Sequence, residues 1–162
     1  MKNFEEWSQK KKSIDNKNHI PPFIKEGSIW WVSIGLNIGS EIYGKNIDYA
    51  RPAVILKKLS SKIYLVAPIT STIKRGFYYE KIVTREQDSY VCFDQIKTCD
   101  YRRFIYEYTI LTEIDYVNVK NKFDAIYTQN KPPRPKAEES EDDTAPRINV
   151  SISEANNKSS TK

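Results

Sequence analysis

The sequence has few of the residues that build metal centres and disulfide frameworks. Among 162 residues there are two cysteines, Cys92 and Cys99, and a single histidine, His19. Two cysteines argue against a disulfide framework. One histidine excludes almost every zinc site and every catalytic triad that uses histidine as its base. We therefore expect a protein that works without a metal and without a cofactor.

Long hydrophobic runs are missing as well. No apolar stretch approaches the roughly 18–20 residues that a membrane-spanning helix needs. The first seven residues already contain charged side chains and have no apolar signal-peptide centre. Five glycines against eight prolines exclude a collagen-like filament. The sequence predicts a soluble, cytoplasmic protein with no membrane partner.

Charge of one sign is in only modest excess. The formal net charge of +5 divides into +2 for residues 1–24 and +3 for residues 25–129, whereas residues 130–162 are neutral. Such an excess permits an anionic partner such as nucleic acid without demanding one.

The two ends of the chain differ in composition from its middle. Residues 130–162 contain no aromatic residue and are dominated by Ser, Asn, Pro, Lys and Glu. They cannot bury enough apolar surface to offset chain entropy, so we expect a disordered tail. Its acidic run, 138–143, is by default a solvated segment. A weaker alternative is that the run mimics nucleic acid and competes for the basic face of the domain.

The first 24 residues are expected to form a helical extension. Phe4, Trp7, Lys11 and Ile14 fall at helical spacing, which predicts a short helix over 3–14 with one apolar edge. An isolated helix of this length would be marginal in water, so we expect it to pack on the rest of the protein.

Residues 25–129 are expected to form one mainly β domain with a closing helix. Segments rich in β-branched and aromatic residues predict strands, and these are 28–34, 52–56, 62–67, 77–83, 90–93, 95–100 and 105–111. Thr112, with Asp115 three residues on, predicts the start of a helix over about 113–127. The expected apolar face of this helix consists of Ile114, Val117, Phe123 and Ile126. Many short strands followed by one helix favour a small barrel.

One connection is too long for a hairpin. Residues 35–49 include three glycines, two asparagines and an aspartate, and the connection ends at Arg51-Pro52. Loops of this length in compact domains are often functional.

At this loop the sequence resembles the MazF/PemK-type toxins, the ribonuclease members of bacterial toxin–antitoxin modules. The resemblance rests on Gly27–Val32, Asn37–Glu41 and Arg51–Leu56, followed in order by Ala67–Ser71 and Phe93–Phe104. It covers about residues 25–128 and leaves out both ends of the chain. Residues 42–50 lengthen the loop relative to the usual family pattern, and Lys97 replaces the usual Arg of the last motif.

The resemblance implies an SH3-like barrel, a homodimer, a cognate antitoxin, DNA binding together with that antitoxin, and metal-independent cleavage of single-stranded RNA. In that reaction the 2′-hydroxyl attacks the adjacent phosphorus. A guanidinium presents paired donors to a phosphate and stays cationic at physiological pH, and a neighbouring hydroxyl adds one hydrogen bond. The resemblance implies catalytic roles for Arg51 and Thr70. The residues expected to bind substrate are Ser40, Glu41, Lys45, Ser71 and Lys74.

Other aromatic and polar residues of the motifs receive structural roles. Trp30, Trp31 and Tyr64 are expected in the core or in a dimer interface. Gln95 and Thr98 are expected to support the loop or the dimer.

Two other functions stay open. A gyrase-directed toxin of the CcdB type would share the fold, but those toxins carry a tryptophan at the C-terminal helix end, and the last tryptophan here is Trp31. A non-catalytic RNA-binding or antitoxin-binding module could use the same barrel, with basic residues and eleven tyrosines meeting RNA by charge and stacking.

Overall fold

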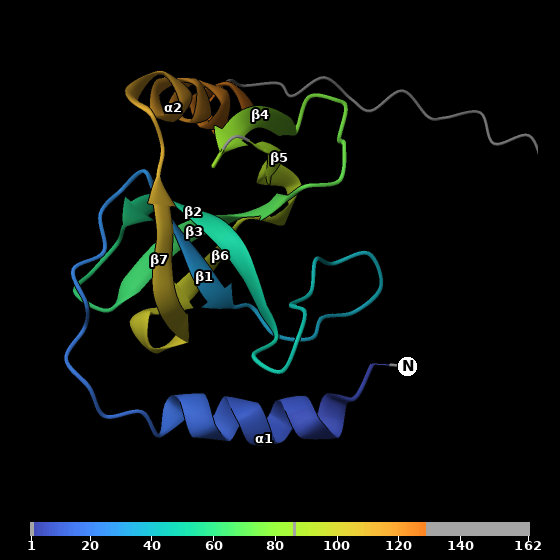
Figure 1. The fold of residues 1–162 in the computed structure, drawn as a ribbon, viewed down its shortest axis with the longest axis vertical. Coiled ribbons are helices and arrows are strands. Elements are labelled where there is room, and N and C mark those ends of the chain that lie inside the picture. Colours follow the sequence, from blue (N-terminus) through green and yellow to red (C-terminus); the bar gives the residue numbers. More distant parts are fainter. Residues whose placement is uncertain (1, 86, 129–162) are drawn as a thin grey trace, which may run out of the picture. The chain divides into compact units, whose positions relative to one another are not determined.

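The computed structural model describes residues 2–85 and 87–128, and the predicted tail lies outside these residues. The fold is a curled antiparallel sheet that forms a half-barrel, with one helix at each end of the described chain (Figure 1). The strands are β1 (Ser28–Ser33), β2 (Ala50–Lys58), β3 (Ile63–Thr70), β4 (Tyr79–Thr84), β5 (Gln87–Cys92), β6 (Lys97–Asp100) and β7 (Phe104–Ile110). The helices are α1 (Phe4–Asp15) and α2 (Glu113–Tyr127), with single 3-10 turns at Phe93–Gln95 and Tyr101–Arg103. The prediction of a mainly β barrel with a closing helix is confirmed.

The sheet curls because β3 takes different partners along its length. The strand order is β4-β5-β3-β2-β1-β7, and β6 pairs with the first half of β3 while β5 pairs with its end. This arrangement bends the sheet around one interior cluster that includes Val32, Tyr64 and Phe104. Trp30 and Tyr64 are buried in that cluster, as expected.

A second cluster lies between the sheet and α2. Thr112 caps the helix by accepting a hydrogen bond from the Asp115 backbone N–H at 3.1 Å, which confirms the predicted start. The predicted apolar face is wrong in its first half. Ile114 is 75% exposed and Val117 48% exposed, whereas Val119 is fully buried. The helix turns the face that carries Val119 and Ile126 toward the sheet.

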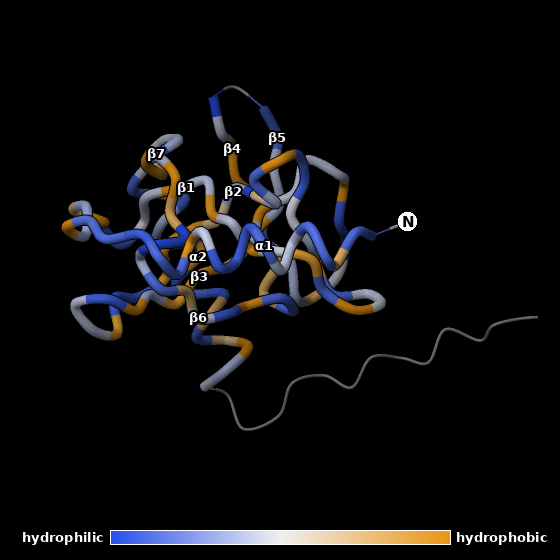
Figure 2. Tube along the Cα trace, turned by 90° about the horizontal axis from the view of Figure 1, so that it is seen from below, coloured by the Kyte–Doolittle hydropathy of each residue, from blue (hydrophilic) through white to orange (hydrophobic). Residues whose placement is uncertain are grey.

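The packing of α1 agrees with the expectation for the N-terminal helix. Trp7 and Ile14 are buried against Tyr49 and Leu36, whereas Phe4 remains 50% exposed. Asn3 caps the helix by accepting from the Glu6 backbone N–H at 3.1 Å. The helix lies across one end of the barrel and is mostly hydrophilic outside these anchors (Figures 1 and 2). None of the helices described is long and apolar enough to cross a membrane.

Each strand differs from its predicted bounds by one or more residues, and two of these differences concern residues of the family motifs. β2 begins at Ala50, so that Arg51 lies inside the strand opposite Val32 rather than ahead of it. The predicted strand over 95–100 begins at Lys97, because residues 93–95 form a 3-10 turn.

Candidate active-site groove

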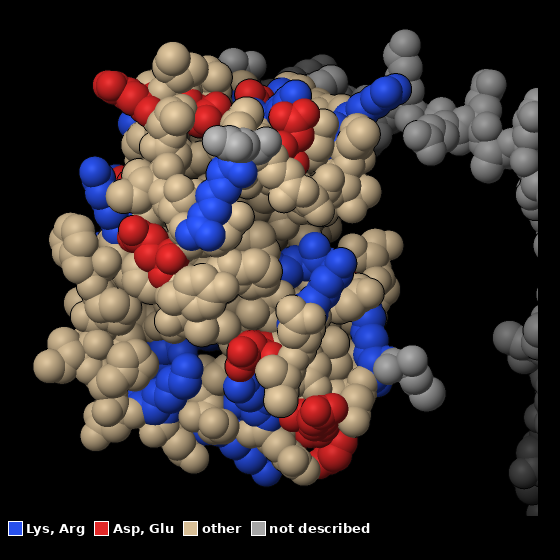
Figure 3. All heavy atoms as spheres, in the orientation of Figure 1, with Lys and Arg blue, Asp and Glu red and all other residues tan. Residues whose placement is uncertain are grey.

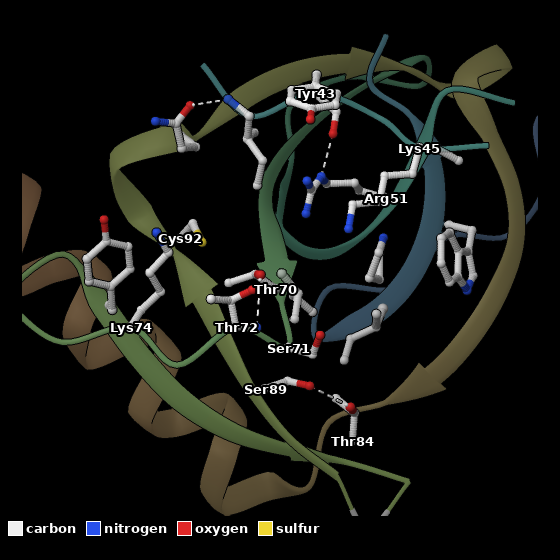
Figure 4. A pocket seen from close by; sticks show the side chains of 18 of the residues that line it. Tyr43, Lys45, Arg51, Thr70, Ser71, Thr72, Lys74, Thr84, Ser89 and Cys92 are labelled. Atoms are coloured by element: carbon white, nitrogen blue, oxygen red, sulfur yellow. Dashed lines mark hydrogen bonds between the residues drawn. The ribbon is translucent and has the colours of Figure 1, made fainter. Parts of the chain in front are cut away.

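A groove of about 700 Å³ lies between the loop that follows β1, the start of β2, the end of β3 and the β4–β5 hairpin. Its lining contains all seven residues singled out from the sequence: Ser40, Glu41, Lys45, Arg51, Thr70, Ser71 and Lys74. They come from separate segments of the chain and are brought together by the pairing of β2 with β1 and β3. Figure 4 shows several of these side chains around the groove.

The Arg51 guanidinium is oriented by the loop beside it. Its Nε donates a hydrogen bond to the backbone carbonyl of Tyr43, and its Cζ lies 5.8 Å from the centre of the Tyr43 ring (Figure 4). Within residues 2–85 and 87–128, the two Nη atoms make no hydrogen bond or ion pair. The outer edge of the guanidinium therefore keeps donors that can meet an anionic ligand.

Thr70 ends β3, where it pairs with Tyr90 of β5. Its Oγ1 accepts a hydrogen bond from the Thr72 backbone N–H at 3.2 Å. The hydroxyl proton is not used in that bond, so Thr70 can donate it to a ligand in the groove.

The loop over the groove is held by its own backbone. Lys45 and Ala50 exchange two backbone hydrogen bonds of 2.9 and 3.0 Å. A Cβ at Gly44 would lie 1.6 Å from the Tyr49 carbonyl oxygen, so only glycine fits there. The loop thus approaches its own backbone closely just after Tyr43.

Two side chains fix the tip of this loop. The Glu41 carboxylate accepts a hydrogen bond from the Ile38 backbone N–H at 2.8 Å. The Gln95 Oε1 accepts from the Ile42 backbone N–H at 3.0 Å. Gln95 therefore supports the loop, as the sequence suggested, while Thr98 is exposed on β6.

The opposite wall contains residues that the sequence analysis missed. The Tyr79 hydroxyl donates to Asp94 Oδ2 at 2.9 Å, and burial together with this carboxylate raises the pKa of Tyr79 to about 12. Burial, reinforced by the Asp94 charge, raises the pKa of the Cys92 thiol to about 11. Both groups are therefore neutral at physiological pH. Asp94 lies in the Phe93–Phe104 motif, and this position in the sequence was the one signal that could have placed it near the site.

Trp31 lines the groove rather than the interior cluster. Its ring lies 6.3 Å from Tyr106 and 6.4 Å from Tyr108, measured between ring centres. Its Nε1 is buried and has no hydrogen-bond partner in the described part of the chain.

The charges around the groove are nearly balanced. The cationic lining residues are Lys45, Arg51 and Lys74, and the acidic ones are Glu41 and Asp94. Figure 3 shows basic and acidic residues interspersed over the face seen in Figure 1. The described residues contain no group of three or more His, Cys, Asp or Glu side chains placed to hold a metal ion.

Comparison with protein families gives one match, to the PemK-like, MazF-like toxins of type II toxin–antitoxin systems, over residues 25–127. The chain belongs to this toxin family. The match begins after α1 and ends at the last residue of α2, so the seven groove residues all fall within the family region.

Two of the matching solved structures illustrate the likeness in fold. An endoribonuclease in complex with its cognate antitoxin, from a mycobacterial species, is 12% identical, with a TM-score of 0.54 over 68% of this chain and all of its own. MazF from Deinococcus radiodurans is 18% identical, with a TM-score of 0.53 over 69% of this chain and all of its own. No curated protein sequence matches the chain significantly.

Proposed function

We propose that this family member is an endoribonuclease toxin that cleaves single-stranded RNA without a metal ion. The observation that supports it most directly is the placement in one groove of a threonine hydroxyl and a guanidinium whose Nη atoms have no partner among residues 2–85 and 87–128. These two groups are what charge stabilisation at a phosphoryl oxygen requires. Arg51 and Thr70 are the proposed catalytic residues.

In the proposed reaction the RNA 2′-oxygen forms a bond to the adjacent phosphorus and the bond from phosphorus to the 5′-oxygen breaks. The 2′-hydroxyl proton leaves to water, and the 5′-oxygen takes up a proton, so the products are a 2′,3′-cyclic phosphate and a 5′-hydroxyl. Arg51 and Thr70 donate to the non-bridging phosphoryl oxygens, where negative charge develops in the transition state.

The remaining groove residues bind the RNA strand in this proposal. Lys45 and Lys74 meet neighbouring phosphates from the two sides of the groove, and Ser40 and Ser71 offer hydroxyls to sugar or base. The carboxylates of Glu41 and Asp94 accept hydrogen bonds from the RNA. Their negative charge repels phosphates and so limits how many phosphates the groove binds.

The proposal includes two protein partners. One is a cognate antitoxin that neutralises the toxin. The other is a second copy of the chain, since β7 and the first turns of α2 carry hydrophobic side chains that are about half exposed or more, namely Tyr106, Ile110, Ile114 and Val117. Trp30 and Tyr64, which were expected in the core or in a dimer interface, are buried in the core and play no part in this face.

The test is to incubate the purified chain with labelled single-stranded RNA in EDTA. We expect fragments that carry a cyclic phosphate, in amounts that excess magnesium does not change. RNA that is bound but stays intact would favour the non-catalytic RNA-binding module. Inhibition of gyrase with intact RNA would favour the CcdB-type function.

A further inference from the structure

The N-terminal segment contacts the groove loop at several points, although it lies outside the family match. The Lys2 ammonium donates to the Asn37 carbonyl at 2.7 Å and lies 4.6 Å from the centre of the Tyr43 ring. Lys10 forms a 2.7 Å ion pair with Asp48. We call residues 2–15 the arm and residues 34–49 the groove loop.

Trp7 is the main anchor between the two. It is 6% exposed, and its ring packs against that of Tyr49, with 5.2 Å between ring centres. It also covers Gly35, where a Cβ would lie 2.3 Å from the indole. Gly35 has a φ of +87°, so both its conformation and this close approach require glycine.

The groove loop has a backbone that needs outside support. Asn46 and Tyr49 have φ values of +59° and +47°, in the left-handed region that residues with a Cβ seldom occupy. Such conformations persist where the surroundings fix them. For Tyr49 the surroundings are Trp7 and the arm.

A continuous set of contacts leads from Trp7 to Arg51. Trp7 packs on Gly35, and the Gly35 carbonyl accepts from the Gly44 backbone N–H at 2.8 Å. Gly44 follows Tyr43, whose carbonyl accepts from Arg51 Nε. A shift of the arm therefore changes the position of the carbonyl that orients the guanidinium.

The arm is also fixed to the barrel at its far end. Arg102 Nη1 lies 2.9 Å from the Asp15 carboxylate, and four residues beyond the arm the His19 carbonyl accepts a hydrogen bond from the Tyr101 hydroxyl at 3.0 Å. These contacts attach the C-terminal end of α1 to the barrel. The helix can therefore hold the groove loop in place through the contacts that its N-terminal part makes.

We propose that the arm is a positioning element for the groove, with Trp7 and Lys10 as positioning residues that act through the groove loop on Arg51. The turnover part of this inference rests on the proposed ribonuclease function, whereas the loop-holding part does not. The arm would supply to this chain the support that its lengthened loop needs.

The experiment compares Trp7→Ala with Phe4→Ala, which removes a half-exposed aromatic ring from the same helix. Hydrogen exchange of the Gly44, Lys45 and Ala50 amides reports on the loop without reference to RNA. We expect faster exchange of these amides in Trp7→Ala alone. We also expect kcat for RNA cleavage to fall about 10- to 100-fold, since misplacing a catalytic group by about 1 Å can cost about 10²-fold. KM should change less, because the lysines of the groove remain.

Further variants separate positioning from loss of stability. Val119→Ala lowers the stability of the α2 cluster and should leave loop exchange and kcat unchanged. Trp7→Phe keeps a ring over Gly35 and should recover most of kcat. Lys10→Asp should speed loop exchange, and the charge-reversed pair Lys10→Asp with Asp48→Lys should restore it.

Unchanged loop exchange in Trp7→Ala would overturn the inference whatever the activity. Faster exchange with wild-type kcat would also overturn it, because the loop would then not control Arg51. Should the wild-type chain fail to cleave RNA, the proposed function falls, and the exchange data alone then decide whether the arm holds the loop.

Discussion

Replacing Arg51 by alanine is the most informative single change in the groove. In the proposed reaction the guanidinium stabilises charge on the phosphoryl oxygens, and its Nη atoms have no competing partner among residues 2–85 and 87–128. Removing one preorganised donor group of this kind costs about 10²–10³ in turnover, or roughly 3–4 kcal/mol. We expect Arg51→Ala to lower kcat by this amount.

Conservative variants sharpen the prediction. Arg51→Lys should recover little, because an ammonium cannot bond the Tyr43 carbonyl and still present two fixed donors to a phosphate. Thr70→Ala should be milder, since a single hydrogen bond to a charged oxygen contributes about 1.5–3 kcal/mol, less than the loss expected for the guanidinium. Thr70→Ser keeps the hydroxyl and should retain most activity.

Single-turnover cleavage of a labelled RNA measures the chemical step, and filter binding to the same RNA measures affinity. Binding should weaken much less than turnover, because Lys45 and Lys74 still meet the phosphates. All variants should unfold at close to the wild-type temperature, since Arg51 is part-exposed at the groove. Cleavage by Arg51→Ala at the wild-type rate would refute the assignment.

Three further outcomes are expected. Val117→Asp should convert a homodimer into a monomer in light scattering, because it places a charge among the exposed hydrophobic residues of β7 and α2; a wild-type monomer would refute the dimer. Gly44→Ala should lower turnover about 10-fold or more, since its Cβ would meet the Tyr49 carbonyl oxygen at 1.6 Å and displace the loop; unchanged kinetics would show that the loop geometry is unimportant. The free energy of unfolding should fall as pH rises from about 9 towards 11, because the pKa of Cys92 is raised from 9.0 to about 11 and the unfolded thiol loses its proton first. Urea unfolding in this range should show a smaller decline for Cys92→Ala than for the wild type.

Local patterns in the sequence were sufficient to predict most of the elements. Strand segments were recognisable because β-branched and aromatic residues gather in short runs between turns. The start of α2 was recognisable because Thr112 and Asp115 form the cap within four residues of chain. The buried face of α2 was not, because spacing alone does not say which side of a helix meets the sheet. Val119 is buried there while Ile114 is exposed.

The sequence was sufficient to predict seven of the residues that line the groove, but not how their side chains are oriented. Five of the seven predicted residues lie in motifs whose order matches a known family, and Lys45 and Lys74 follow two of these motifs within four residues. Their convergence was therefore expected from the resemblance. The orientation of Arg51 comes from a backbone carbonyl, that of Tyr43, which leaves no signature in the identity of the residue. The wall formed by Tyr79 and Cys92 depends on the pairing of β5 with both β4 and the end of β3. This pairing joins segments that are distant in the sequence, so local patterns did not predict it.

The balance of charge in the groove bears on how it would act on RNA. A surface that gained its affinity from charge alone would carry a clear excess of cations, whereas this groove sets Lys45, Arg51 and Lys74 against Glu41 and Asp94. Electrostatic attraction along the strand is therefore weak, and the groove's effect on a phosphate depends on where the guanidinium points. That direction is fixed by the Tyr43 carbonyl, and so by the loop and by the arm that contacts it. In the proposed function, the conformation of the groove loop matters more for turnover than the net charge of the protein does.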